Sequence, residues 1–257
     1  MARYQVILSY DGTEFHGFQR QGNERTVQLE VENALRRMGW KENSILAAGR
    51  TDSGVHANGQ VIAFDLQWSH DTETLARAMN AHLPDDIGIR SVKPAEAAFH
   101  PRFDAVWRTY RYQVYFYPFR DPLRDRFAWR LWPKSGRVLP QQAANQFIGT
   151  HDFRAFGTPM KPGGNTVRTV QESFWTEMRG TWTFQITANA FLKHMVRRIV
   201  HVQILTAMNK MSHEQLEDCI SKGLDTPPGL APPNGLTLHE VAYEDRSTEI
   251  KEGELAE

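Results

Sequence analysis

The sequence contains very little cysteine: Cys219 is the only one among 257 residues. A single cysteine excludes an intramolecular disulfide and any zinc module built from several cysteines. No apolar segment approaches the ~20 residues needed to cross a bilayer. The N-terminal segment also lacks the long apolar stretch of a secretory signal. These absences predict a cytoplasmic protein with no membrane among its partners.

Motifs that mark common cofactors are absent as well. The chain has no GxGxxG after a strand, no GxxxxGK[ST] and no HExxH, which excludes the usual dinucleotide, phosphate-loop and zinc-protease signatures. Its ten histidines do not fall into metal-ligand spacings. If the chain is an enzyme, we expect it to work with neither a cofactor nor a metal.

The charges balance, but they are not evenly distributed. Thirty Lys and Arg residues offset thirty Asp and Glu residues, which excludes a uniformly basic surface. Residues 102–137 nevertheless hold nine Lys or Arg against three Asp, and the segment from Met178 to His213 contains no acidic residue. Two such segments favour a cationic patch for an anionic partner such as nucleic acid. Acidic residues from elsewhere in the fold that neutralise these segments are the alternative.

Aromatic residues gather between Phe99 and Trp132, where arginines alternate with them. Aromatic rings beside arginines suit unstacked nucleobases. For most of these rings, packing of a strand into the core is the better explanation, because strands and cores favour aromatic residues.

The pattern of apolar residues predicts an α/β protein of the α+β type, with hairpin-like strands in each half. Thr26 is predicted to be the N-cap of the first helix. We expect an N-terminal lobe over residues 1–103, a C-terminal lobe over residues 104–245 and a disordered acidic tail over residues 246–257. Strands are predicted over residues 4–9, 60–66, 87–92, 103–116, 167–178, 182–187 and 236–243, and helices over residues 27–38, 72–82, 140–148, 191–209 and 212–221.

The most unusual stretch is a loop, Gly49-Arg-Thr-Asp-Ser-Gly-Val-His-Ala57. Its glycines allow the backbone to approach a ligand closely. Arg50 and Asp52 occupy alternate positions, so they share one side of an extended backbone. The local pattern alone favours a turn or cap role for Asp52 over a catalytic role.

This loop resembles the GRTDxGVHA signature of the tRNA pseudouridine synthase A family. Similar segments follow in the family's order over nearly the whole chain. Phe18, Ser53, Ala190 and His201 depart from residues common in the family. The matching segments are Tyr10–Gln21, Thr26–Gln28, Asn80–Ile87, Phe99–Phe103, Arg108–Tyr112, Phe191–Ile199 and Ala231–Leu238.

The resemblance implies a pseudouridine synthase fold of two lobes, each with an antiparallel or mixed sheet flanked by helices, and a central cleft. It implies the isomerisation of uridine to pseudouridine in the anticodon stem-loop of tRNA, at tRNA positions 38 to 40. The expected partners are therefore tRNA and a second copy of the chain in a homodimer, and not DNA.

Three residues receive catalytic roles through the resemblance. Asp52 is the catalytic carboxylate, as either a nucleophile at C1′ or a base that removes a ribose proton. Arg197 matches the arginine that pairs with this aspartate. Tyr110 matches a tyrosine that stacks on the target base and is a candidate to remove the proton from C5.

Other residues are expected to bind substrate. Leu236 resembles an apolar residue that closes over the base. Arg50 is expected to position the extruded nucleotide or its phosphate. Lys193 and Arg198, on the helix predicted from Phe191 to Asn209, are expected to contact RNA phosphates.

Two other functions compete with this assignment. A catalytically idle RNA chaperone of the same fold would keep the basic segments without needing Asp52. A hydrolase of nucleosides or nucleotides would use Asp52 at C1′ of a small molecule, without needing the acid-free segment.

Overall fold

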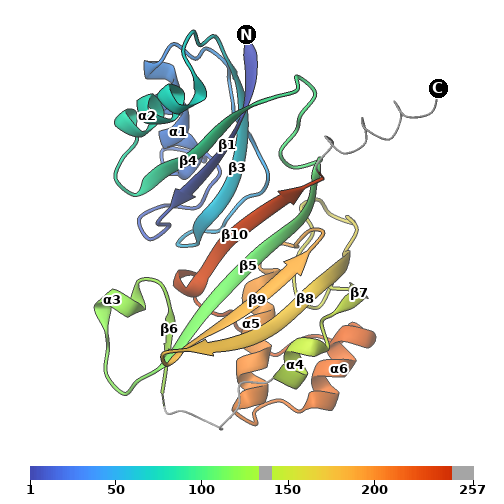
Figure 1. Cartoon of the computed structure of the whole chain (residues 1–257). Helices are drawn as coiled ribbons and strands as arrows, with labels where there is room; N and C mark the ends of the chain where they lie inside the picture. Colours follow the sequence, from blue (N-terminus) through green and yellow to red (C-terminus); the bar gives the residue numbers. More distant parts are fainter. Residues whose placement is uncertain (133–140, 245–257) are drawn as a thin grey trace, which may run out of the picture.

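A computed structural model describes residues 1–132 and 141–244, so the tail predicted over residues 246–257 lies outside the described residues. The strands form one ten-stranded mixed sheet (Figure 1) in the order β4-β1-β3-β10-β5-β9-β8-β7, with β2 paired to β3 and β6 paired to β5. The strands are β1 (Ala2–Tyr10), β2 (Leu46–Ala47), β3 (His56–Leu66), β4 (Ile87–Ala95), β5 (Ala105–Phe116), β6 (Trp129–Leu131), β7 (Gly149–Asp152), β8 (Val167–Met178), β9 (Thr181–Ala188) and β10 (Leu236–Tyr243).

The helices are short and flank this sheet. Figure 1 shows α1 and α2 beside β1, β3 and β4, and α4, α5 and α6 beside β7, β8 and β9. Thr26 is the N-cap of α1, as predicted, and its hydroxyl accepts a hydrogen bond from the Leu29 amide. The helices are α1 (Val27–Arg37), α2 (Thr72–His82), α3 (Pro122–Asp125), α4 (Gln141–Asn145), α5 (Met195–Ala207) and α6 (His213–Ser221), with a 3-10 turn η1 at Pro233–Gly235. The α/β prediction is confirmed.

Strand β10 joins the two halves. It runs parallel to β3 over two residue pairs, Thr237 with His56 and Leu238 with Ala57, and antiparallel to β5 along its whole length. The sheets of the two predicted lobes are therefore continuous with each other. The same pairing places the end of the Gly49–Ala57 loop against the start of β10.

The buried apolar residues form two clusters. One contains the N-terminal strands and α1, together with Leu238 and Val241 of β10. The other contains the strands and helices after residue 110, together with Val55. Because each cluster takes residues from the other half, the domain boundary after residue 103 stays a prediction.

The predicted hairpin of β8 and β9 is confirmed. Met178 pairs with Thr181, which leaves a two-residue loop. Both loop residues, Arg179 and Gly180, have positive φ angles, 51° and 76°. Such a turn matches the twist of the flanking strands.

The helix predicted from Phe191 to Asn209 begins later, at Met195. The backbone of Lys193 is held instead by Thr158, through hydrogen bonds of 3.0 and 3.2 Å. The prediction that Lys193 lies on this helix was therefore wrong. Within the described ranges, no helix combines the length and apolar character needed to cross a membrane.

Candidate active site

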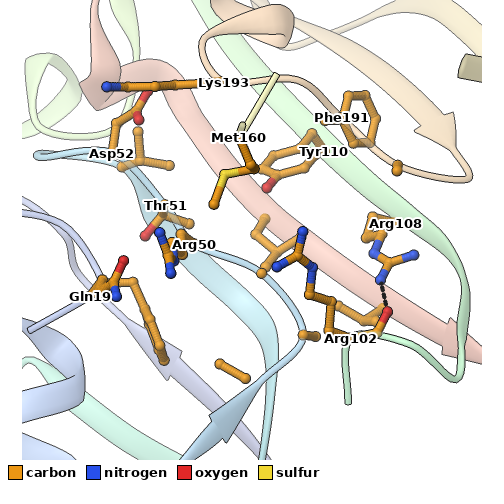
Figure 2. A pocket seen from close by; sticks show the side chains of 18 of the residues that line it. Gln19, Arg50, Thr51, Asp52, Arg102, Arg108, Tyr110, Met160, Phe191 and Lys193 are labelled. Carbon is orange, nitrogen blue, oxygen red and sulfur yellow. Dashed lines mark hydrogen bonds between the residues drawn. The ribbon is translucent and has the colours of Figure 1, made fainter. Parts of the chain in front are cut away.

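A cavity of about 1030 Å³ opens between the two halves of the sheet (Figure 2). Among the described residues that line it, Asp52 is the only acidic one. A single carboxylate inside a cationic cavity suits a polyanionic substrate that is acted on at one point. The cationic lining residues are Arg20, Arg50, Arg102, Arg108, Arg168, Lys193 and Arg197.

The loop that carries Asp52 is fixed on the N-terminal half. The Thr51 carbonyl accepts a hydrogen bond from the Phe18 amide at 3.1 Å, and the Thr51 hydroxyl bonds to the buried Tyr10 phenol at 2.8 Å. A Cβ at Gly17 would lie 2.8 Å from the same Thr51 carbonyl, so only glycine fits there. Asp52 is thereby presented by a rigid loop, as a reacting group requires.

His56 connects this loop to the C-terminal half. Its Nδ1 accepts a hydrogen bond from the Gly12 amide at 3.0 Å, and its Nε2 lies 3.1 Å from the Asn234 carbonyl. The two partners together fix a neutral ring that is protonated on Nε2. Burial lowers the pKa of His56, although the charge of Asp11, whose Oδ1 lies 3.1 Å from His56 Nδ1, opposes the shift.

The lowered pKa of His56 predicts a loss of stability in acid. Folded His56 binds a proton less readily than His56 in the unfolded chain, where histidine has a pKa of about 6.5. The contribution of neutral His56 to the free energy of unfolding is therefore complete above that pH and is lost as the pH falls. We expect His56→Gln, which keeps one acceptor and one donor, to make the melting temperature less dependent on pH between about 7.5 and 5. Thermal melts of both proteins across this range measure the effect.

The exposed His70 offers a matched control, because His70→Gln makes the same chemical change away from this junction. We expect it to leave the pH dependence of the wild type unchanged. An equal loss of acid sensitivity in both variants would contradict the role assigned to His56.

Two side chains from the C-terminal half approach the carboxylate of Asp52. Arg197 Nη1 lies 3.4 Å from Asp52 Oδ2, and Arg197 Nε donates to the Ala231 carbonyl at 2.8 Å. His194 Nε2 lies 3.6 Å from the same oxygen. The side chains of Asp52 and Arg197 are 28% and 15% exposed, so the pair is shielded without being fully desolvated. This geometry keeps a positive charge beside the carboxylate.

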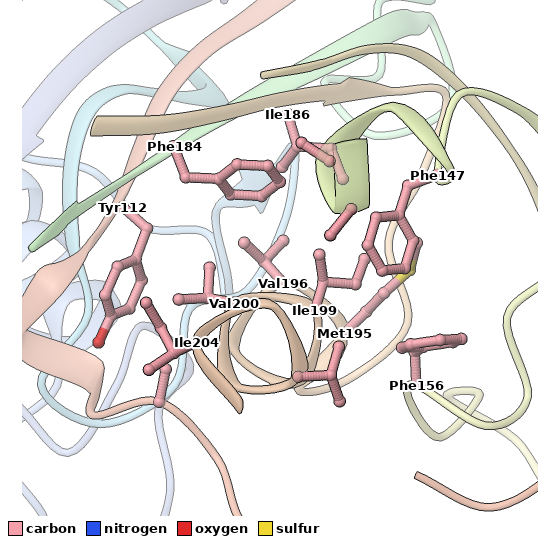
Figure 3. Packing of buried hydrophobic residues seen from close by; sticks show 14 of the residues in the cluster. Tyr112, Phe147, Phe156, Phe184, Ile186, Met195, Val196, Ile199, Val200 and Ile204 are labelled. Carbon is pink, nitrogen blue, oxygen red and sulfur yellow. The ribbon is translucent and has the colours of Figure 1, made fainter. Parts of the chain in front are cut away.

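Helix α5 positions Arg197 through its packing (Figure 3). Val196, Ile199 and Val200 are buried and face Phe184 and Tyr112 of the sheet. Burying each such side chain stabilises the fold by roughly 1.5–3 kcal/mol. Arg197 follows Val196 by about 100° around the helix, at the side of this buried face, and lines the cavity.

His194 has an unusual backbone. Its φ of 67° is left-handed, a conformation that is uncommon for residues other than glycine. The residue is the N-cap of α5 and directly follows Lys193. Burial lowers the pKa of His194, and the cations Lys193, Arg197 and Arg198 add to the shift while Asp52 opposes it. At neutral pH the ring is therefore uncharged.

Tyr110 lines the cavity from β5, and its ring packs edge-on against Phe191 at 4.9 Å. Burial, with a smaller contribution from the charge of Asp52, raises the pKa of Tyr110 to about 12. The phenol is therefore protonated at neutral pH. Leu236 and Leu238 of β10 line the cavity as well, and Leu238 is the register partner of Tyr110.

Comparisons with known proteins identify the family of the chain. A model of the tRNA pseudouridine synthase family matches residues 6–104 and 143–244, which include Asp52 and Arg197. The chain belongs to this family. The tRNA pseudouridine synthase A of Pseudothermotoga lettingae is 39% identical over 248 residues, 95% of this chain and 100% of that protein. The tRNA pseudouridine synthase A of Bacillus subtilis is 37% identical over 246 residues, again 95% and 100%.

The residues expected to bind RNA divide into two groups. Arg50 and Lys193 line the cavity with Asp52. Arg198 does not: it points toward the segment after α6, where its Nη1 lies 3.5 Å from the Thr226 hydroxyl. A contact between Arg198 and RNA stays a prediction, and it would lie outside this cavity.

Several residues that line the cavity had no role predicted from the sequence, among them His194 and Arg168. His194 precedes Arg197 by three positions, and helical spacing would have placed both on one side of α5. Arg168, at the start of β8, gives no comparable signal. Its Nη1 donates only to the Asn165 and Val167 carbonyls, and its Nε has no hydrogen-bond partner. In the part of the chain that the structure describes, no group of three His, Cys, Asp or Glu residues could hold a metal ion.

Proposed function

We propose that this chain isomerises uridine to pseudouridine in the anticodon stem-loop of tRNA. The observation that carries the proposal is the position of Asp52, the only acid among the described lining residues of a cationic cavity, with Arg197 at 3.4 Å. A cavity of about 1030 Å³ is large enough for an extruded nucleotide. Family membership supports the same activity.

The chemistry needs an ionised carboxylate at the sugar. In the reaction the N1–C1′ bond breaks, a C5–C1′ bond forms, C5 loses its proton and N1 gains one, so no atom is added or removed. Asp52 either attacks C1′ or removes a ribose proton, and in both cases Arg197 contacts its carboxylate, with 3.4 Å between Nη1 and Oδ2. Leu236 supplies an apolar wall for the base.

Tyr110 completes the assignment as the surface on which the target base stacks. A protonated phenol also donates a hydrogen bond. Removal of the C5 proton by the phenol oxygen therefore requires Tyr110 to release its own proton in the same step.

A direct test is to incubate the purified protein with folded tRNA that carries tritium at C5 of its uridines. The proposed reaction releases that tritium to water, and digestion of the tRNA should then reveal pseudouridine in the anticodon arm. A protein that binds the tRNA but produces neither signal would refute the proposed activity.

Lys193 is expected to hold an RNA phosphate at the edge of the cavity. Removing one phosphate contact reduces the salt dependence of binding, so Lys193→Ala should lower the log–log salt slope by about 0.7–0.9. Turnover at saturating tRNA should stay near the wild-type value, because Lys193 does not contact the reacting carboxylate. Titrations at several salt concentrations measure this, and an unchanged slope would remove Lys193 from the RNA-binding surface.

The same titration on Arg198→Ala tests the second predicted phosphate contact.

We also propose that the chain acts in the cytoplasm as a homodimer, whose joined cationic cavities would bind a single tRNA. A neutral chain gains a large basic surface in this way. Light scattering should give twice the mass of 29.5 kDa.

A further inference from the structure

Phe103 is the most exposed aromatic ring at the cavity. The residue is 74% exposed, and it lines the cavity that contains Asp52. An aromatic ring left in water contributes little to folding, so an exposed one on a functional surface is a candidate for ligand contact. In the sequence, Phe103 belongs to the aromatic segment between Phe99 and Trp132 and to a segment that resembles the family, and neither gave it a role of its own.

A rigid turn holds this ring in place. The Phe103 amide donates to the His100 carbonyl at 3.1 Å, and the Arg102 amide donates to His100 Nδ1 at 3.1 Å. Arg108 Nη2 donates to the Arg102 carbonyl at 2.6 Å, which anchors the turn to β5 (Figure 2). Tyr243 anchors it to β10 by donating to the Pro101 carbonyl at 2.8 Å. The backbone that carries the ring is thus fixed, which lowers the cost of ordering it on binding.

A guanidinium and a second ring lie beside Phe103. The Arg102 guanidinium lies 5.8 Å from the ring centroid, and the His100 ring lies 4.3 Å away. The acid beside them in the chain, Asp104, accepts a hydrogen bond from the His100 amide at 2.9 Å. A flat apolar surface next to a guanidinium matches a nucleobase with its adjoining phosphate.

We propose that Phe103 is the stacking platform of a second nucleotide subsite, which takes an unpaired base next to the uridine held at Asp52. Arg102 binds the phosphate of that neighbouring nucleotide. The proposal rests on the proposed function, because it assumes an RNA whose target uridine enters the cavity. Extruding a uridine unstacks its neighbours, which costs free energy, and stacking on Phe103 offsets part of that cost.

The first experiment compares tRNA binding by the wild type and three variants, with fluorescence anisotropy on prefolded tRNA. Stacking on an aromatic ring corresponds to about 5- to 150-fold in affinity, so Phe103→Ala should weaken binding within that range. Phe103→Tyr should bind like the wild type and Phe103→Leu should not, because only a flat ring stacks. The salt slope should stay unchanged, since stacking releases no counterions.

Phe119 provides the matched control, with a ring that is 71% exposed and does not line the cavity. Phe119→Ala should leave tRNA affinity unchanged. Light scattering on every variant gives the oligomeric state. If Phe103→Ala loses affinity only because the dimer dissociates, the ring contacts a second copy of the chain and the proposal is overturned.

The second experiment identifies the base. Single abasic nucleotides are placed in turn on either side of the target uridine of the tRNA. At one position the abasic tRNA should bind the wild type more weakly, by the same factor as Phe103→Ala weakens binding of intact tRNA. The same abasic tRNA should bind Phe103→Ala no more weakly than intact tRNA does. Additive losses at every position would overturn the proposal.

These results separate the subsite from the proposed function. If the wild type forms pseudouridine and Phe103→Ala binds tRNA normally, only the subsite is refuted. The wild type could instead form no pseudouridine while the abasic substitutions still identify one base that stacks on Phe103. In that case the subsite stands and the proposed reaction fails.

Discussion

Asp52→Asn is expected to lower the rate of pseudouridine formation by at least about 10³-fold, as the loss of a nucleophile or general base does. The amide keeps the size of the side chain, but it neither attacks C1′ nor takes up a proton. Binding of tRNA should stay within about twofold of the wild type, because phosphate contacts supply most of the affinity. Tritium release under saturating tRNA and anisotropy titrations measure the two quantities separately.

Asp85→Asn is the matched control for this experiment. It makes the same chemical change at an exposed carboxylate that does not line the cavity, and it should leave both quantities unchanged. A second variant, Asp52→Glu, keeps the charge but displaces the carboxylate by about one methylene, a shift that costs on the order of 10²-fold. If Asp52→Asn retained a tenth of the wild-type rate, Asp52 would not be the reacting group.

The local elements of the fold could be predicted because their signals are local. Thr26 forms an N-cap with a residue three positions away, and the loop at Arg179 and Gly180 is determined by two neighbouring residues. The late start of α5 could not be predicted in this way. Lys193 leaves the helical pattern because its backbone pairs with Thr158, which is remote in the sequence. The two-residue parallel pairing of β10 with β3 is equally invisible to periodicity.

In the candidate site too, local segments could be predicted from the sequence, whereas contacts between remote residues could not. The Asp52 motif and the Arg197 helix were recognisable as segments, and the structure brings these two residues within 3.4 Å of each other across 145 positions. Spacing along the chain gives no sign of that approach, so only family resemblance predicted the pair. Arg168 reaches the same cavity from β8, and its residue type alone does not distinguish it from a surface arginine.

Arg197 is expected to affect turnover rather than binding. It makes two contacts at once, with its Nε on the Ala231 carbonyl at 2.8 Å and its Nη1 at 3.4 Å from Asp52 Oδ2. Removing a positioned charge beside a reacting group costs about 10²- to 10³-fold in rate. We expect Arg197→Met, which keeps the apolar stem, to lose that much of kcat at saturating tRNA, with little change in affinity.

Two further variants test whether the loss of kcat depends on the geometry of Arg197 or on positive charge alone. Arg197→Lys keeps the charge but lacks the forked guanidinium that contacts both the Ala231 carbonyl and Asp52 Oδ2. It should therefore recover only part of the rate. Arg198→Ala removes an adjacent cation whose guanidinium lies by Thr226, outside the cavity, and should leave kcat near the wild-type value. Thermal melts of each variant exclude a general loss of folding as the cause. If Arg197→Met changed only the salt slope of tRNA binding and not kcat, Arg197 would be a phosphate contact, and the role assigned to it beside Asp52 would be wrong.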